Sequence, residues 1–153
     1  SAAAINQPDL GRQASEVVGN QSVVVVLDVK KQRLGSKYYV YTHNGTINTK
    51  LEVSELARRF EILGAGEVVI NSIDCDGGMQ GYDLKLIKQV RDIVTIPVTA
   101  LGGVGSLEHI KELVSCFGII GASAGSLFVF KGRYRAVLIN YPDQSVKDEI
   151  VKY

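Results

Sequence analysis

The sequence predicts an α/β chain that forms half of an eight-unit (β/α) barrel, and three observations support this prediction. Four runs rich in Val and Ile alternate with helical stretches, which is the order of parallel βαβ units. Eight such units take about 250 residues, whereas this chain has 153. Glycine-rich segments follow the last two runs, as in barrels that bind phosphate, and the first run lacks the glycine fingerprint of a doubly wound sheet.

The predicted strands are the four apolar runs. The first contains residues 23–27, an unbroken aliphatic stretch. Such continuous runs are typical of strands that are buried on both faces of a parallel sheet, so we expect both faces to be covered. The four predicted strands are 22–27, 67–71, 96–100 and 118–122.

A helical stretch follows each predicted strand. In the first of them Leu51, Leu56, Phe60 and Leu63 recur near a 3.6-residue period. The predicted helices are 51–63, 84–94, 107–117 and 133–141, preceded by a helix at 8–18 ahead of the first strand. Their boundaries are marked by Ser106 as the N-cap of the third, Pro142 after the fourth and Gly19 after the helix at 8–18.

One segment departs from the plain strand–helix unit. Residues 37–43 alternate around Tyr38, Val40 and Thr42, and Asn44-Gly45 follows, which is a strong hairpin signal. We therefore expect residues 30–50 to form an excursion above the sheet, a hairpin. No linker or low-complexity segment interrupts the chain, so residues 1–153 are predicted to form a single domain.

Composition excludes several classes of protein. Hydrophobic residues make up 46%, charged residues 22%, and the formal net charge is +1, so no strong field recruits nucleic acid or an anionic membrane. The longest aliphatic run is far shorter than the roughly 20 residues that span a bilayer, and no signal peptide is expected. The two cysteines, Cys75 and Cys116, have neither metal nor disulfide spacing, which favours the cytoplasm.

Asp28 is the candidate acid–base residue. It directly follows the first aliphatic run, at the carboxyl end of a predicted barrel strand, where catalytic residues of barrels lie. A partly desolvated carboxylate there suits general acid–base catalysis. Alternatively, it is a strand-end residue that turns into solvent or pairs with Lys30 or Lys31, and spacing alone does not decide between the two.

The segment after the second predicted strand, residues 72–78, contains Asp74, Asp76 and Gly77. It resembles the start of a calcium loop, but the twelfth position from Asp74 is Lys85 rather than the required Glu, which excludes calcium. The segment is either a simple turn or a loop over a substrate, with carboxylates facing hydroxyl or amino groups.

Two glycine-rich segments, residues 102–105 and 121–126, follow the last two predicted strands. Glycines let backbone N–H groups approach an anion, and a helix N-terminus adds partial positive charge. The pair together favours a phosphate site over two plain turns. His43 and His109 are isolated from the cysteines and from each other, so each is expected to be a surface or packing residue rather than a metal ligand or a base.

These motifs together resemble the C-terminal half of the cyclase subunit of imidazole glycerol phosphate synthase, over residues 1–140. The most specific stretches are Val25-Val26-Leu27-Asp28-Val29-Lys30, Gly64-Ala65-Gly66-Glu67, Ser72-Ile73-Asp74-Cys75-Asp76-Gly77, Gly81-Tyr82-Asp83 and Leu101-Gly102-Gly103-Val104-Gly105. The Gly-Tyr-Asp ending favours the cyclase over the sister isomerase of the same pathway.

The resemblance implies a TIM barrel that acts on a ribulosyl aminoimidazole carboxamide nucleotide with ammonia from a glutaminase subunit. It places the second of two catalytic aspartates at Asp28 and the substrate-loop residues at Asp76 and Gly77. It places phosphate-binding residues at Gly102, Gly103, Gly125 and Ser126, and it implies no cofactor and no metal.

The chain also departs from the family pattern. The opening half, with the first catalytic aspartate, is absent from this sequence; Leu101 replaces a usual Ser, the usual Thr near Gly78 and Asn71 is missing, and the hairpin is about two residues longer. Such departures resemble variants that are associated with surface-polysaccharide genes.

Three hypotheses follow. The chain is half of a cyclase-type lyase that is inactive alone, an ammonia-conducting or phosphate-binding scaffold for a sugar amidotransferase, or a self-associating half-barrel that binds phosphate without catalysis. Open sheet edges predict a homo-oligomer in each case.

Overall fold

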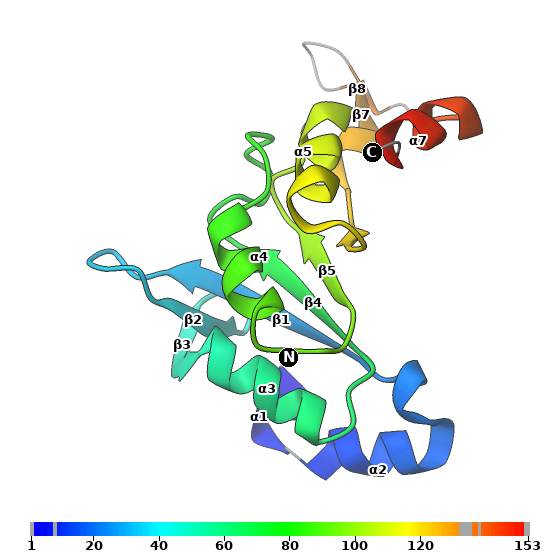
Figure 1. Cartoon of the computed structure of the whole chain (residues 1–153). Coiled ribbons are helices and arrows are strands. Elements are labelled where there is room, and N and C mark those ends of the chain that lie inside the picture. The colour runs from blue at the N-terminus through cyan, green and yellow to red at the C-terminus, as the bar shows by residue number, and fades with distance from the viewer. Residues whose placement is uncertain (1, 8, 132–135, 138, 152–153) are drawn as a thin grey trace.

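The computed structural model describes residues 2–7, 9–131, 136–137 and 139–151, and its elements alternate as the sequence predicts (Figure 1). The strands are β1 (Val24–Lys31), β2 (Tyr38–Thr42), β3 (Ile47–Glu52), β4 (Glu67–Ser72), β5 (Val98–Leu101), β6 (Gly121–Ala122), β7 (Phe130–Lys131) and β8 (Ala136–Val137). The helices are α1 (Ala2–Asn6), α2 (Asp9–Val18), a 3-10 turn (Asn20–Ser22), α3 (Val53–Ile62), α4 (Leu84–Arg91), α5 (Leu107–Phe117), α6 (Ser126–Val129) and α7 (Gln144–Val151).

One six-stranded sheet in the order β3-β2-β1-β4-β5-β6 organises the chain. The strands β1, β4, β5 and β6 run parallel, in a register that aligns Val26 with Val69 and Val69 with Thr99. This confirms the predicted α/β fold, consistent with part of a (β/α) barrel. The strand expected at 96–100 begins two residues later, after Pro97, which has no N–H to donate to a ladder.

The prediction that the strands are buried on both faces is wrong. Val25, Leu27 and Val29 of β1 are 6%, 0% and 0% exposed, whereas Val24 and Val26 are 50% and 39% exposed. Helices α3 and α4 cover one face of the sheet (Figure 1), and no layer in the described part of the chain covers the other. A continuous apolar run shows that both faces of a strand are suited to burial. It does not show whether a second layer is present to cover each face.

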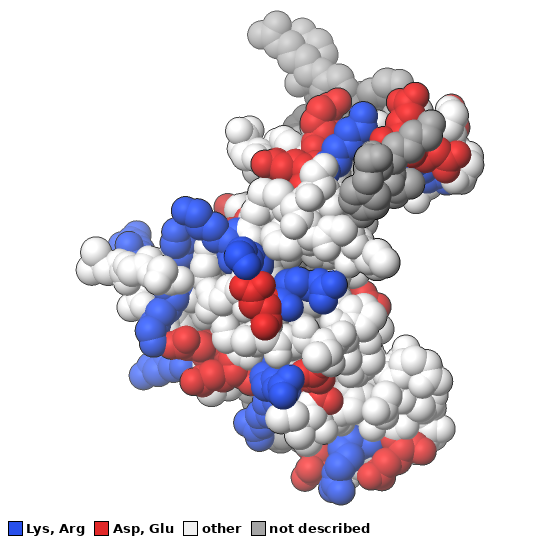
Figure 2. Space-filling view, viewed as in Figure 1, with Lys and Arg blue, Asp and Glu red and all other residues white. Residues whose placement is uncertain are grey.

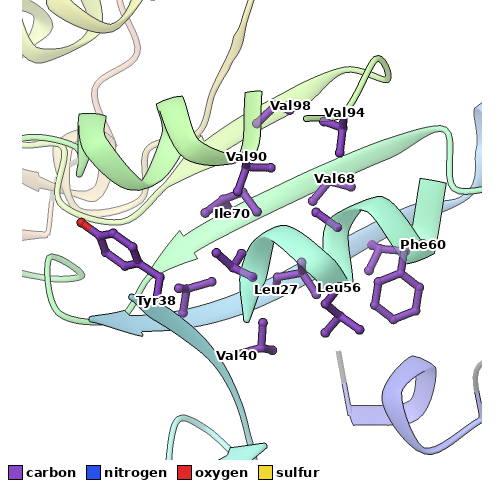
Figure 3. Close-up of a cluster of buried hydrophobic side chains, with 14 of the residues drawn as sticks. Leu27, Tyr38, Val40, Leu56, Phe60, Val68, Ile70, Val90, Val94 and Val98 are labelled. Carbon is purple, nitrogen blue, oxygen red and sulfur yellow. The ribbon is translucent and has the colours of Figure 1, made fainter. Parts of the chain in front are cut away.

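The hydrophobic core lies between the covered face of the sheet and its helices (Figure 3). Leu27 of β1 and Ile70 of β4 pack there with Leu56 and Phe60 of α3 and Val90 of α4. The predicted period is confirmed at Leu56 and Phe60, whereas Leu51, expected to begin that helix, lies in β3. Lysines, arginines, aspartates and glutamates are interspersed over the outside of this layer (Figure 2).

The predicted hairpin exists but does not lie above the sheet. Strands β2 and β3 are antiparallel and extend the same sheet beyond β1. Their turn contains Asn44 and Gly45, with φ values of 55° and 76°, a conformation that the Asn-Gly pair favours. Pairing of β2 with β1 runs only from Asp28 to Lys31, so it leaves the first half of that edge of β1 unpaired by β2.

The C-terminal helix prediction is wrong where the structure describes it. Residues Ala136–Val137 form β8 against β7, and the last helix, α7, begins at Gln144. The Asp143 carboxylate accepts from the Val146 N–H at 3.1 Å, so the helix starts after Pro142 instead of ending before it. Residues 133–135 and 138 of the predicted helix lie outside the described residues. Among the described helices, none is long and apolar enough to cross a membrane.

Candidate functional site

The carboxyl ends of the parallel strands bring the predicted site residues to one edge of the sheet. The register aligns Asp28 of β1 with Asn71 of β4, and Asn71 with Leu101 of β5. Aligned residues of parallel strands project from the same face, and for these three it is the uncovered one. In a complete barrel this face would line the interior, so the side chain of Asp28, the candidate acid–base residue, would point into the barrel.

Asp28 is held by Asn71. The Asn71 Nδ2 donates to the Asp28 Oδ1 at 2.8 Å, and this hydrogen bond orients the carboxylate. Lys30 does not pair with Asp28, because its Nζ donates to the Gly45 carbonyl oxygen at 3.2 Å. The Asn71 Oδ1 is buried and accepts no hydrogen bond from the described atoms. A partly buried, hydrogen-bonded carboxylate is an arrangement suited to acid–base work.

Sequence reasoning did not assign Asn71 to the site, although a signal was present. In β4, Glu67, Val69 and Asn71 alternate onto the face opposite to the buried Val68 and Ile70. Combined with the parallel register, that alternation places Asn71 beside Asp28.

The loop after β5 needs its glycines. Gly102 and Gly103 have φ values of 90° and 98°, in the region that favours glycine. A Cβ at Gly103 would lie 2.1 Å from the Gly81 carbonyl oxygen, and one at Gly102 would lie 2.9 Å from the Asn71 Oδ1. The backbone therefore approaches both β4 and the following loop more closely than any side chain allows.

The motif Gly81-Tyr82-Asp83 connects three parts of the site edge. The Gly81 N–H donates to the Gly103 carbonyl oxygen at 2.8 Å, and the Tyr82 hydroxyl donates to the Ser123 carbonyl oxygen at 3.0 Å. Burial raises the pKa of Tyr82 to about 12, so this hydroxyl stays protonated as a donor. The motif thus ties the loops after β5 and β6 to the start of α4.

Asp83 completes this set of contacts. Its Oδ1 accepts from the Leu86 N–H at 3.0 Å as the N-cap of α4, and from the Tyr38 hydroxyl at 3.1 Å. Burial, followed by this hydrogen bond to Asp83, raises the pKa of Tyr38. The hairpin is thereby fastened to the same loop that carries the motif.

The two aspartates of the loop at 72–78 have different surroundings. The Asp74 Oδ2 accepts from the Lys31 N–H at 2.8 Å, so this carboxylate holds the start of the hairpin loop. Asp76 and Gly77 are exposed, and the Asp76 N–H donates to the Ser72 carbonyl oxygen at 2.9 Å. The Asp76 side chain is exposed, whereas the Asp74 carboxylate is engaged by the Lys31 N–H.

The second glycine segment is held against β5. The Ser123 N–H donates to the Ala100 carbonyl oxygen at 2.8 Å, and exposed Gly125 precedes the short helix α6, which Ser126 begins. At the first segment, the Gly105 N–H donates to the His109 Nδ1 at 3.1 Å, so this amide is already engaged. His109, expected to be a surface or packing residue, therefore contacts the predicted phosphate loop.

Comparison with known proteins identifies relatives. The profile of the histidine biosynthesis protein family matches residues 1–135. The putative imidazole glycerol phosphate synthase subunit HisF of Leptospira interrogans is 48% identical over 150 residues, which is 98% of this chain and 59% of that protein.

Two further relatives extend this similarity to other bacteria. The putative imidazole glycerol phosphate synthase subunit hisF3 of Vibrio vulnificus is 46% identical over 152 residues, covering 99% of this chain and 58% of that protein. The imidazole glycerol phosphate synthase subunit HisF of Petrotoga mobilis is 43% identical over 138 residues, covering 89% of this chain and 53% of that protein. The chain thus spans less than two thirds of the length of these relatives.

Proposed function

This chain belongs to the histidine biosynthesis protein family, and from that premise we propose that it supplies the acid–base and phosphate-binding half of an imidazole glycerol phosphate synthase cyclase barrel. The observation that supports this most is the hydrogen-bonded pair of Asp28 and Asn71 at the same sheet edge as the two glycine loops. Acid–base and anion-binding groups are thereby gathered where barrel enzymes carry out their chemistry.

Each residue has a proposed role. Asp28 transfers protons as the imidazole ring closes and the bond to the carboxamide ribotide breaks. One phosphate of the substrate lies against the backbone of Gly102, Gly103, Gly125 and Ser126, and the loop with Asp76 and Gly77 closes over it. The substrate itself, a ribulosyl aminoimidazole carboxamide nucleotide, follows from the resemblance and from the names of the relatives.

The remaining parts come from elsewhere. By resemblance, a second catalytic aspartate lies on the opening strand of the barrel, and a glutaminase subunit delivers ammonia. We therefore propose that this half is inactive alone and active when an opening half completes the barrel.

Self-association is the proposed state of the chain without that half. Val24 and Val26 are 50% and 39% exposed on the uncovered face, and the first half of β1 is unpaired by β2. Apolar surface and an open strand edge of this kind favour association. A second copy of the chain is the proposed cover.

A second candidate function rests on Leu101. This side chain is aligned with Asn71 in the register and replaces a hydroxyl that the family usually has beside the phosphate. A barrel with a weakened substrate site fits a scaffold that conducts ammonia or binds phosphate for a sugar amidotransferase.

The experiment combines this chain with the opening half of the Leptospira interrogans relative. Turnover of the ribulosyl nucleotide with ammonium chloride is measured for the chain alone and for the pair. We expect activity only in the pair. An assembled pair without cyclase activity would contradict the cyclase proposal and favour the scaffold.

A further inference from the structure

His109, near the start of α5, lies between the two loops that surround the proposed phosphate site. Its Nδ1 accepts from the Gly105 N–H at 3.1 Å. A Cβ added at Gly81 would lie 3.7 Å from the ring Cδ2 and 3.8 Å from Cγ, so the imidazole lies beside Gly81, at the distance of a methyl group in van der Waals contact. Gly81 in turn donates its N–H to the Gly103 carbonyl oxygen at 2.8 Å. One side chain is therefore hydrogen-bonded to the loop after β5 and lies beside the loop before α4.

The contact defines the protonation state of the ring. A backbone N–H can only donate, so the Nδ1 must offer a lone pair, and the single proton of the neutral imidazole is on Nε2. An imidazolium has N–H groups at both nitrogens and cannot accept. The contact with Gly105 therefore exists only while the ring is neutral.

Charged groups lie on α5 itself and on α7, which packs against α5 and carries Lys147, Asp148 and Glu149. On its own helix, Glu108 interacts electrostatically with His109, and Lys111 lies nearby in the sequence. Gly81, which lies beside the ring, has no titratable side chain; Asp76 and Asp83 flank it in the sequence.

We propose that His109 is a positioning residue that locks the glycine loop against the Gly-Tyr-Asp loop and so fixes the backbone donors of Gly102 and Gly103 for an anion. This inference rests on the proposed phosphate site. The physical reason is entropy: glycines at positive φ have the largest conformational freedom to lose, and an anion site made of backbone N–H groups needs them held before the anion arrives.

Two substitutions separate the hydrogen bond from simple packing. In His109→Asn, the Oδ1 takes the place of the Nδ1 as acceptor, without a titratable ring. In His109→Leu, apolar bulk remains and the acceptor is lost. His43 is the other histidine of the chain and lies in the hairpin turn, where its Nδ1 contacts the Thr42 Oγ1 at 3.1 Å, so His43→Asn is the matched control.

The test uses NMR of the chain, with inorganic sulfate as the probe because it stays doubly charged from pH 5 to 8. Without sulfate, the Gly105 amide resonance of the wild type should shift with the same midpoint as the His109 ring, and the ring nitrogens should report the Nε2–H form at pH 8. At pH 8, His109→Leu should weaken sulfate binding about three- to tenfold, the worth of one hydrogen bond. His109→Asn and His43→Asn should stay within about twofold of the wild type.

The outcomes are distinguishable. Wild-type chain that binds no sulfate would overturn the phosphate site and this inference with it. Normal sulfate binding that His109→Leu leaves unchanged, or a Gly105 amide that ignores the titration of His109, would overturn this inference alone.

Discussion

The two faces of strand β1 have different surroundings: one packs in the hydrophobic core, and the other carries a residue of the candidate site. On the helix-covered face of β1, Val25, Leu27 and Val29 are buried in the core. On the other face, exposed Val24 and Val26 precede Asp28, which is hydrogen-bonded to Asn71. The same run of valines thus contributes to the buried core on one face, and on the other face its side chains stay exposed. The covered face should respond to substitution through folding, and the uncovered face through activity and association.

The uncovered face is not uniformly apolar. Beside the valines, on β4 and β5, the Thr99 Oγ1 donates to the Glu67 Oε1 at 2.6 Å, and the register aligns Glu67 with Val24. Covering a polar group costs desolvation free energy, so a face that is only buried against another layer is usually apolar. The uncovered face therefore carries paired polar groups as well as apolar side chains.

The largest expected effect concerns Asp28 on the uncovered face. In the barrel completed by an opening half, Asp28→Asn keeps the shape of the side chain but removes its titrating proton, so turnover should fall about 10²–10⁴-fold, the usual contribution of general acid–base catalysis. Steady-state rates measure it. Asp92→Asn is the control, since Asp92 is exposed and pairs with Lys88 at 2.8 Å away from the site. Near-full activity of Asp28→Asn would show that Asp28 is only a strand-end residue.

Alanine substitutions at Val25 and Val26 compare how much each face of β1 contributes to the free energy of unfolding. Val25→Ala should lower the free energy of unfolding by about 1.5–3 kcal/mol, because it removes buried methyl groups and leaves a cavity. Val26→Ala removes the same atoms from the uncovered face and should cost less than about 1 kcal/mol. Denaturant unfolding at one fixed protein concentration compares them. Equal losses would mean that another copy of the chain buries Val26 as fully as the helices bury Val25.

Association itself is the next expectation. Light scattering should give a mass above the 16.6 kDa of one chain. Val24→Glu combined with Val26→Glu should shift the protein toward the monomer, since each places a charge on the surface that would be covered. Glutamates at Val17 and Ile62, which are exposed on helices, provide the control. A wild-type chain that is monomeric at working concentration would contradict self-association.

Much of this fold follows from local patterns, and its departures have physical causes. Helices α2 to α5 and the hairpin follow from residue period, glycine ends and the Asn-Gly turn. The cover on each face of β1 does not follow from the strand, because it depends on chain that is distant or absent. The error at 133–141 arose from treating Pro142 as a stop, whereas Asp143 directly after it is an N-cap.

The site was predicted in part for the same reason. Asp28 could be predicted because a carboxylate directly follows an aliphatic run. The glycine loops could be predicted because clusters of glycine follow the last two strands. Asn71 can be assigned to the site only when the register of β1 and β4 is known. The hydrogen bond between Gly105 and His109 can be recognised only when the positions of the residues at the start of α5 are known. Residues 1–153 as one domain, and the roles of the site residues, stay predictions.

The smallest expected effect concerns Tyr82, which joins the loops of the site from the covered side. Tyr82→Phe keeps the buried ring but removes the donor to the Ser123 carbonyl oxygen, so it should lower the free energy of unfolding by about 0.5–1.5 kcal/mol at neutral pH. The pKa of Tyr82 is raised to about 12 in the folded chain from its ordinary value of 10.0, so the folded state holds this proton more tightly than the unfolded state. Its contribution is therefore complete below pH 10 and is lost as the pH rises toward about 12.

The advantage of the wild type over Tyr82→Phe should accordingly shrink above pH 10, where the variant has no phenol to titrate at this position. Urea unfolding of both proteins at pH 7, 9 and 10.5 measures it, and Tyr39→Phe, on a half-exposed hairpin residue, is the matched control. A difference that stays constant across this range would mean that the Tyr82 hydroxyl is solvated rather than bound to Ser123. In that case the loop after β6 would not be tied to the Gly-Tyr-Asp motif.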